Sequence, residues 1–257
     1  MTRDYTNLFR IDGRKAVVVG AGSGIGREAA VALAAHGALV VCADADAESA
    51  AATAQLAGRA ESVTVDVSDE RSLSDFARAN TDCSILVHTP AINVRKSICD
   101  YTLTEFDRVV GLNLRSTFHI LQLFGRSMCS NGNGSIVTVS SIRAQTVEPG
   151  QGVYAATKSG LESLVRTAAA EFGPSNVRVN AIRPGVVETP LTAQLKNNPS
   201  WYSAYAEKPA LQRWAQAWEM AGVVVFLASD ASTYVTGTTI AVDAGWTAID
   251  GRFTPPL

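Results

Sequence analysis

One local pattern in the chain fits few folds: an apolar strand, a glycine-rich turn, a helix and a second apolar strand that ends in an acid. The strand Arg14–Val19 runs into the turn Gly20–Gly26. Small apolar residues then recur at helical intervals up to Gly37, and a second strand, Ala38–Asp44, completes the unit. This order predicts two parallel strands joined by a helix, with the glycine turn at the carboxyl end of the first strand.

A glycine-rich turn at the end of a strand can bind the phosphates of a dinucleotide. Glycines let the backbone approach a pyrophosphate without obstruction by Cβ atoms, and the start of the next helix offers free N–H groups to the anion. Asp44 lies 18 residues beyond Gly26, about where a ribose-binding acid is expected. A 2′-phosphate there would meet a carboxylate, and the neighbouring Ser23 and Ala45 offer no compensating cation. The unit therefore favours NAD(H) over NADP(H).

Strand-like and helix-like segments alternate along the rest of the chain. Further apolar runs occur at residues 63–65, 84–87, 135–139, 177–182 and 239–242. Helical patterns cover residues 68–80, 104–128, 153–172 and 218–228, with Ser68 and Thr104 as expected N-caps. Parallel strands need crossover connections, which are right-handed. The alternation predicts an α/β fold with a Rossmann-like, doubly wound sheet of about seven parallel strands and helices on both faces.

Size and composition fit one globular domain, and we expect residues 1–257 to form it. Hydrophobic residues make up 47% of the chain, and 22 basic against 24 acidic residues leave a formal net charge of −2. This balance argues against a nucleic-acid surface or an anionic-membrane anchor. No apolar stretch is long enough to span a bilayer, and Met1–Arg14 lacks the apolar core of a secretory signal. We expect residence in the cytoplasm.

The cysteines and histidines are dispersed. Because no paired metal-ligand spacing occurs, reduced and buried thiols are the expectation for all four cysteines, Cys42, Cys83, Cys99 and Cys129. The three histidines form no cluster either. We expect no metal at the reacting centre.

Polar residues follow the predicted strands at the points where the strands end. They are Asp44, Asp66, His88–Ala91, Ser140–Ser141 and Pro184–Gly185. In a doubly wound sheet, ligands bind at the carboxyl ends of the strands where the winding direction reverses. These residues are therefore expected to converge on one crevice.

Tyr154 and Lys158 are four positions apart within a predicted helix, so both side chains turn toward the same side. A phenol ordinarily loses its proton near about pH 10, and a nearby cation makes it a usable acid or base by stabilising the phenolate. Lys158 can supply that cation. The spacing alone also occurs on many solvated helix faces, and the surrounding pattern decides between the two interpretations.

With these pieces in place, the sequence resembles the short-chain dehydrogenase/reductase family over about residues 10–246. The matching segments are Gly20–Gly26, Asp66–Val67, Leu112–Leu114, Ser141, Tyr154–Lys158, Pro184–Gly185 with Thr189, and Phe226–Asp230. The resemblance implies an enzyme that moves a hydride between a nicotinamide cofactor and an alcohol or ketone. Binding of NAD(H) is then expected from Gly20, Ser23, Gly24, Ile25, Gly26, Asp44, Asp66, Val67, Thr89, Tyr154, Lys158, Pro184, Gly185, Val187 and Thr189.

The resemblance also implies catalytic roles. Asn113 would hold a water in a proton relay, Ser141 would hydrogen-bond the substrate oxygen, and Tyr154 would transfer the proton. Lys158 would assist Tyr154 while gripping the nicotinamide ribose. Ser140 is expected to be a structural neighbour of Ser141, although two adjacent serines leave both assignments open.

One segment departs from the family pattern. His88-Thr89-Pro90-Ala91 replaces Asn-Asn-Ala-Gly, so contacts with the ribose must be made differently. Pro90 has no N–H to donate, and Ala91 lacks glycine's backbone freedom. For His88 we favour a hydrogen-bonded side chain that replaces the usual asparagine's structural bonds over a new functional role. The family's threonine before the first glycine is Val19 here.

The segment from about residue 191 to 214 is expected to form a lid over the substrate. Its aromatic side chains can exclude water from hydride transfer or simply pack the lid onto the core. Candidate substrate contacts are Arg95, Arg143, Gln151 and Trp201. Arg143 suits a bidentate pair with a substrate carboxylate, with an ordinary solvated arginine as the alternative. A small polyol, sugar or sugar acid is the expected substrate.

Two rival functions remain open: reduction of a 3-oxoacyl thioester, against which Asp44 argues, and a non-catalytic dinucleotide-binding protein. Long apolar helix faces near residues 104–128 and 153–172 suggest subunit contacts, and the resemblance implies a homo-oligomer, a tetramer or a dimer. The Pro255–Pro256 tail can reach a neighbouring subunit or remain disordered.

Overall fold

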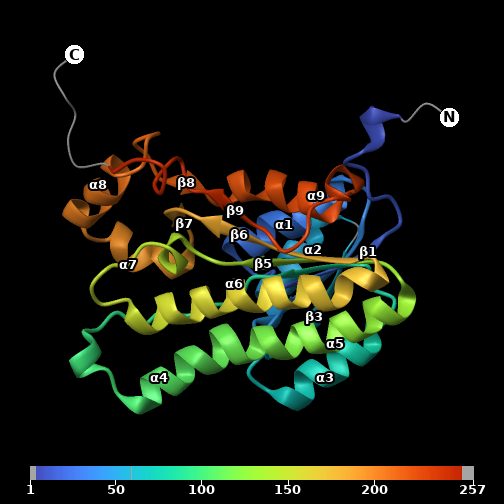
Figure 1. The fold of residues 1–257 in the computed structure, drawn as a ribbon, viewed down its shortest axis with the longest axis horizontal. Helices are drawn as coiled ribbons and strands as arrows, with labels where there is room; N and C mark the ends of the chain where they lie inside the picture. Colours follow the sequence, from blue (N-terminus) through green and yellow to red (C-terminus); the bar gives the residue numbers. More distant parts are fainter. Residues whose placement is uncertain (1–3, 59, 251–257) are drawn as a thin grey trace.

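The protein consists of one parallel sheet between two layers of helices (Figure 1). The computed structural model describes residues 4–58 and 60–250. The strands of the main sheet are β3 (Ala60–Thr64), β2 (Leu39–Asp44), β1 (Lys15–Val19), β4 (Ile85–His88), β5 (Gly134–Val139), β6 (Val177–Pro184) and β9 (Thr239–Val242), in that spatial order. All neighbours pair in parallel, and the winding direction reverses between β1 and β4. The predicted doubly wound fold of seven strands is confirmed.

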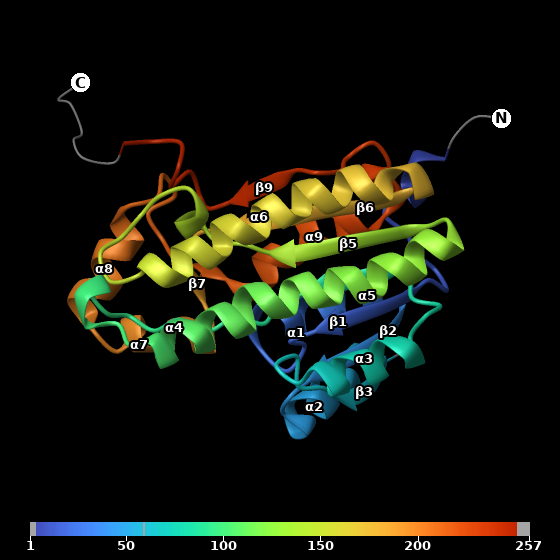
Figure 2. The same ribbon diagram turned by 60° about the horizontal axis from the view of Figure 1, so that its bottom comes forward.

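Side chains that alternate along the strands divide the core in two. Ala16 and Val18 of β1 pack into one cluster, and Val17 and Val19 pack into the other. The first cluster lies under α1 (Gly24–Ala35), α2 (Ala47–Ala57) and α9 (Ala221–Ala228), and the second under α3 (Glu70–Ala79), α5 (Ser116–Asn131) and α6 (Gly152–Phe172) (Figure 2). Because both faces are buried, the central strands are almost wholly apolar.

Short 3₁₀ segments complete the chain between these elements. They are η1 (Tyr5–Asn7), η2 (Ile98–Asp100), η4 (Ile142–Ala144), η5 (Gly173–Ser175), η6 (Pro190–Thr192), η7 (Ala217–Met220) and η8 (Asp230–Ser232). The predicted helix over residues 218–228 is therefore a 3₁₀ turn followed by α9. The edge strand β3 covers Ala60–Thr64 rather than the predicted residues 63–65. None of its residues is fully buried, and its sequence is not an apolar run that would have marked its start.

Two helices begin at other residues than predicted. Asp69 caps α3 by accepting hydrogen bonds from two N–H groups of the first turn, so the prediction of Ser68 was wrong. α4 (Leu103–Val110) begins after Thr102 rather than Thr104. The Thr102 hydroxyl accepts from the Glu105 N–H, and the Glu105 carboxylate accepts from the Thr102 N–H at 3.0 Å. This reciprocal pair satisfies two otherwise free donors and sets the helix start.

The predicted single helix over residues 104–128 is interrupted. α4 and α5 are joined by one π-helical turn, η3 (Gly111–Arg115). Such turns leave carbonyls without their usual partners, and here the hydroxyls of Ser116 and Thr117 donate to the carbonyls of Leu112 and Asn113. The turn places Asn113 fully inside the protein.

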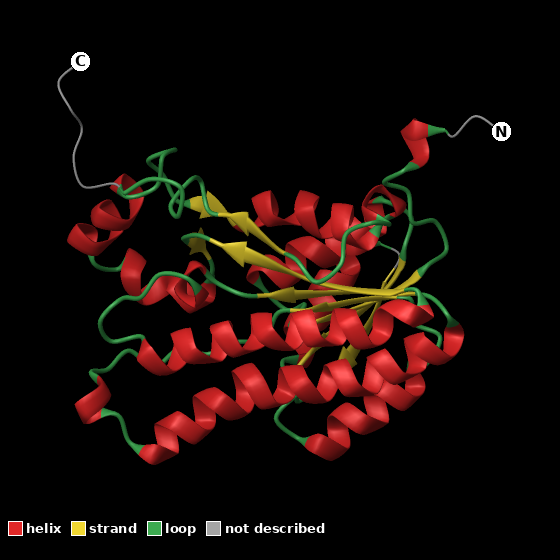
Figure 3. Ribbon diagram, in the orientation of Figure 1, coloured by secondary structure: helices red, strands yellow, loops and turns green. Residues whose placement is uncertain are grey.

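The expected lid contains η6, α7 (Ala193–Lys196) and α8 (Pro199–Glu207) and lies beyond the carboxyl ends of the strands (Figure 3). Two short strands that the sequence did not predict, β7 (Val187–Glu188) and β8 (Ala215–Gln216), pair with each other. This pairing ties the two ends of the lid together at its base. Within the lid, the ring of Trp214 stacks on Tyr202 at 5.0 Å and on Tyr205 at 5.8 Å. These rings form a small core that packs the lid.

The cysteine prediction holds for two of the four side chains. Cys42 and Cys83 are buried, and burial raises their pKa values to about 11 and about 12. Cys99 is exposed and Cys129 is half-buried, so the expectation of four buried thiols was wrong. Within the described ranges, no helix has the length and apolar character of a membrane span, and no three His, Cys, Asp or Glu side chains gather as metal ligands. The Pro255–Pro256 tail lies outside these ranges.

Candidate active site

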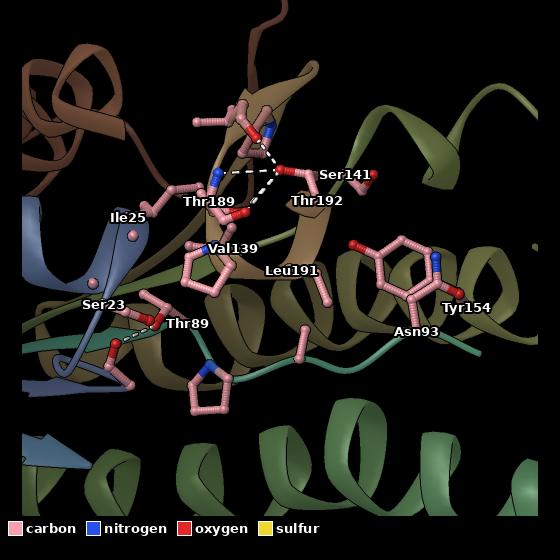
Figure 4. Close-up of a pocket in the computed structure, with 18 of the residues that line it drawn as sticks. Ser23, Ile25, Thr89, Asn93, Val139, Ser141, Tyr154, Thr189, Leu191 and Thr192 are labelled. Atoms are coloured by element: carbon pink, nitrogen blue, oxygen red, sulfur yellow. Dashed lines mark hydrogen bonds between the residues drawn. The ribbon is translucent and has the colours of Figure 1, made fainter. Parts of the chain in front are cut away.

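A cavity of about 530 Å³ opens at the carboxyl ends of the strands, where the winding direction reverses (Figure 4). All fifteen residues expected to bind the cofactor line it. Of the expected catalytic residues, Ser141, Tyr154 and Lys158 line it and Asn113 does not. Apart from His88, the residues that were predicted to converge at the ends of the strands line this cavity.

The glycine turn has the geometry that a phosphate requires. A Cβ atom on Gly26 would lie 2.0 Å from the carbonyl oxygen of Gly20, so only glycine fits. Gly20 and Gly24 have φ values of +81° and +51°, which other residues rarely adopt. α1 begins at Gly24, and the side chain of Ser23 makes no capping hydrogen bond. The first N–H groups of this helix therefore remain available to an anion in the cavity.

Asp44 is fixed at the rim of this turn. Its carboxylate accepts from the Gly22 N–H at 2.8 Å and from the Asp46 N–H at 3.1 Å. One residue here was not predicted: Arg27, whose guanidinium donates to the carbonyl of Gly22 and to the hydroxyl of Thr53. Its place directly after the last glycine was the available signal. Arg27 braces the turn from outside the cavity lining.

Thr89 shows how the unusual segment after β4 supports the turn. Its hydroxyl lies 3.0 Å from the carbonyl oxygen of Val19 and 3.2 Å from that of Gly20, and donates to them. Pro90 packs against Gly20 on the same side. The segment His88–Ala91, which departs from the family pattern, therefore supports the glycine turn through the side chain of Thr89.

His88 contradicts its prediction. It is buried at the end of β4, and neither ring nitrogen has a hydrogen-bond partner in the described part of the chain. The expectation that it replaces the structural bonds of an asparagine was therefore wrong. Burial, assisted by the positive charge of Lys158, lowers the pKa of the His88 ring to about 3. The imidazole is neutral at physiological pH.

Tyr154 and Lys158 lie one turn apart on α6, and both are buried. The Lys158 Nζ donates to the carbonyl of Val139 at 2.7 Å and lies 5.7 Å from the centre of the Tyr154 ring. Burial lowers the pKa of Lys158 to about 8. Burial raises the pKa of Tyr154, while the Ser141 hydroxyl and the charges of Arg95 and Arg143 oppose that rise. Lys158 thus lies beside the Tyr154 ring, and the charges of Arg95 and Arg143 also favour the phenolate.

The adjacent serines have different surroundings. Ser140 is buried and donates to the carboxylate of Glu162 at 2.7 Å, and Glu162 forms an ion pair with Arg183. Ser141 begins η4, where its hydroxyl accepts from the Arg143 N–H at 3.1 Å, and it lines the cavity with Tyr154 (Figure 4). The geometry therefore favours Ser141 as the substrate-facing residue and Ser140 as its structural neighbour.

Asn113 lies behind the cavity wall. Its side-chain oxygen accepts from the Ile92 N–H, and its amide nitrogen donates to the Ile92 carbonyl, both at 2.9 Å. The same nitrogen donates to the hydroxyl of Thr157. Asn113 thus joins η3, the segment after β4 and α6 through its side chain.

Asp66 and Thr189 line the cavity but also serve local structure. The Asp66 carboxylate accepts from the Ser68 N–H at 2.8 Å, ahead of α3. Thr189 caps η6, where its N–H donates to the hydroxyl of Thr192 at 3.1 Å. Thr189 therefore has both the expected position and a capping role, whereas the cap of α3 is Asp69 and not Asp66.

Three of the four expected substrate contacts line the cavity. Arg95, Arg143 and Gln151 line the cavity, but Trp201 does not and instead lies under the Arg95 guanidinium at 5.8 Å. Arg143 is neither solvated nor free, because it is buried and paired with the carboxylate of Glu148. Sequence reasoning missed Glu148, which follows no strand and matches no motif. The carboxylate of Glu148 thus already pairs with the Arg143 guanidinium, which was expected to bind a substrate carboxylate.

Comparison with known proteins shows which family the chain resembles over its length. A family model described as "Enoyl-(Acyl carrier protein) reductase" matches residues 20–247. Galactitol 2-dehydrogenase (L-tagatose-forming) from Cereibacter sphaeroides is 35% identical over 251 residues, which is 95% of this chain and 99% of that protein. A short-chain type dehydrogenase/reductase from Mycobacterium marinum superposes with a TM-score of 0.91 at 28% identity, covering 96% of this chain and all of that one.

A solved relative from Beutenbergia cavernae has NADP bound at low occupancy; it has a TM-score of 0.90 and 35% identity, and the match covers 94% of this chain and 100% of the other. The matches extend over nearly the whole chain and include every segment that lines the cavity. The chain therefore belongs to the short-chain dehydrogenase/reductase family, whose members are oxidoreductases that act on alcohols and ketones with a nicotinamide dinucleotide.

Proposed function

We propose that this protein is an NAD-dependent oxidoreductase that interconverts a secondary alcohol and a ketone in a small polyol, sugar or sugar acid. The observation that carries the proposal is the Tyr154 phenol, which shares one cavity with the glycine turn and has Lys158 one helical turn further on. A relative named for galactitol, a polyol, supports the substrate class.

The bound dinucleotide supplies the acceptor or donor of the hydride. When a carbinol loses hydride, its oxygen must also lose a proton, and a base within hydrogen-bonding distance lowers that barrier. Tyr154 takes this proton, and Ser141 holds the same oxygen by a hydrogen bond. In the direction of reduction the neutral phenol returns the proton, and its raised pKa keeps it protonated for that purpose. Lys158, which lines the same cavity, would assist Tyr154 and bind the nicotinamide ribose, and the buried Asn113 would hold a water of the proton relay.

NAD(H) is the proposed cofactor because Asp44 places a carboxylate at the rim of the phosphate turn. A 2′-phosphate beside it would bring two negative charges together in the mouth of the cavity. The turn residues would hold the pyrophosphate, Asp44 the adenosine ribose, and Thr189 the nicotinamide amide. The lid over residues 191–214 would close the substrate end.

Two rival functions remain. Reduction of a 3-oxoacyl thioester is supported by a relative named 3-oxoacyl-[acyl-carrier-protein] reductase, which is 32% identical over 245 residues, but such an enzyme would more commonly use NADP(H), which Asp44 disfavours. A non-catalytic binding protein would have no use for a buried Tyr154 and Lys158 that line the cavity. Residence in the cytoplasm stays a prediction.

We also infer a homo-oligomer, a dimer or a tetramer. Leu103 and Phe106 of α4 and Phe118 of α5 are 82%, 44% and 51% exposed on one helical layer. An apolar face of this kind is typical of a subunit contact.

The test is an initial-rate screen of polyols, sugars, sugar acids and their ketones with both nicotinamide cofactors, followed at the absorbance of the reduced ring. The proposal expects turnover with NAD(H) and a smaller kcat/KM with NADP(H). A preference for NADP(H) would overturn the cofactor assignment. Binding of NAD(H) without turnover of any compound would favour the non-catalytic alternative.

A further inference from the structure

We propose that Glu148 sets the charge of the substrate pocket, so that the enzyme selects a neutral polyhydroxylated substrate and rejects the corresponding carboxylate. This inference rests on the proposed function and narrows its substrate class. Glu148 lies in the segment between η4 and α6, on the side of the cavity formed by the lid.

Glu148 is fixed by four side chains. Its carboxylate pairs with the Arg143 guanidinium, accepts from the Gln151 amide and from the Tyr205 hydroxyl, and lies 3.6 Å from Nη1 of Arg95. Arg143 is further held between the rings of Tyr205 and Trp246, at 5.8 Å and 5.5 Å from their centres. Arg143 therefore makes its contacts within the protein, and its guanidinium is not free to form a bidentate pair with a ligand.

The remaining polar atoms of the wall match a hydroxyl. The amide nitrogen of Asn93 donates to Gln151 at 2.8 Å, which leaves its Oδ1 buried without a partner among the described residues. The Nε of Arg95 is buried and unpartnered within the same ranges. Both residues line the cavity that holds Tyr154. One atom needs a donor and the other an acceptor, and hydroxyl groups supply both.

A carboxylate fits this wall poorly. It offers only acceptors, so Asn93 Oδ1 would stay unsatisfied, and burying such an atom is costly. A substrate carboxylate bound to Arg95 would also lie close to the Glu148 carboxylate, which already interacts with the same guanidinium. In a partly desolvated pocket two such charges repel strongly. Glu148 thereby acts as a specificity-determining residue without contacting the reacting atoms.

The experiment compares kcat/KM for a neutral polyol with kcat/KM for the sugar acid of the same chain length, in wild type, Glu148→Gln and Arg143→Met. Wild type should favour the polyol. Glu148→Gln should shift the ratio at least tenfold toward the acid, because the two arginine charges are then uncompensated. Arg143→Met should shift it toward the polyol. The matched control Glu207→Gln removes an exposed carboxylate from α8 and should leave the ratio unchanged.

A wild-type preference for the acid, or a ratio that Glu148→Gln leaves unchanged, would overturn the inference while the proposed function stands. If Glu148→Gln does not fold, the wild-type ratio and its change in Arg143→Met decide the question. Absence of turnover with every alcohol and ketone tested would instead contradict the proposed function itself.

Discussion

His88 shows how a single buried side chain links the site to stability. Its neutral ring sits at the end of β4 with both nitrogens unsatisfied, which costs free energy that a bonded side chain would not. Its pKa is about 3 in the folded protein against 6.5 for an unperturbed ring. Between these values the unfolded chain binds a proton that the native protein does not. The free energy of unfolding therefore decreases as pH falls below about 6.5, because protonation stabilises the unfolded chain alone.

We predict that His88→Asn, which removes this titrating group, weakens the loss of stability on acidification. Between about pH 7 and pH 5 the wild-type free energy of unfolding should fall by about 2 kcal/mol more than that of the variant. Urea unfolding at fixed protein concentration measures both. The control His119→Asn makes the same substitution in a half-buried residue of α5 and should behave as wild type. Equal pH dependence in wild type and His88→Asn would contradict the role of His88.

The cavity residues that directly follow a strand could be predicted from the sequence, because the carboxyl ends of parallel strands lie at one edge of the sheet. Tyr154 and Lys158 could be assigned because helical spacing brings them together. Glu148 could not, since its partners come from three segments that meet only in the folded protein. The same is true of Arg95 and Arg143, whose charges act on the Tyr154 phenol together with the Lys158 that spacing indicated.

At the scale of elements, the unit from β1 to β2 was predicted most fully. Its glycines, its apolar runs and its terminal acid all require the same local geometry, and the structure has each in place. Helix boundaries were predicted less well, because N-caps depend on reciprocal hydrogen bonds that several nearby residues could make. The π-helical turn at Gly111–Arg115 could not be predicted, because the apolar periodicity of a helix does not reveal such a turn. The β7–β8 pair was missed because each strand has only two residues.

This unit makes a prediction about the cofactor. Asp44→Asn keeps an acceptor for the Gly22 N–H but removes the charge at the rim. The ratio of kcat/KM with NAD⁺ to kcat/KM with NADP⁺ should fall at least tenfold, or about 1.4 kcal/mol of discrimination. Asp46→Asn neutralises the exposed carboxylate that caps α2, where asparagine caps equally well, and should leave the ratio unaltered. An unchanged ratio in Asp44→Asn would show that another group selects the cofactor.

At the scale of the whole molecule, α4 and α5, which lie in one layer with α6 (Figure 2), carry the exposed apolar side chains that we assign to subunit contact. Wild type should sediment as a dimer or tetramer, and the double variant Leu103→Glu/Phe118→Glu should sediment as a smaller species. Leu56→Glu, on an exposed residue of α2 across the sheet, is the control and should not change the assembly. A monomeric wild type, or a double variant that assembles like wild type, would contradict the assignment.

The most direct test of the whole account is single-turnover alcohol oxidation by wild type and Tyr154→Phe, measured as formation of NADH at saturating NAD⁺. The substitution removes one oxygen from a side chain that lines the cavity, and binding of NADH by fluorescence should be retained. The account predicts that the rate falls by about a hundredfold to ten-thousandfold, as loss of a general acid–base group requires. A variant rate within a few-fold of wild type would contradict the central claim that this phenol carries the proton.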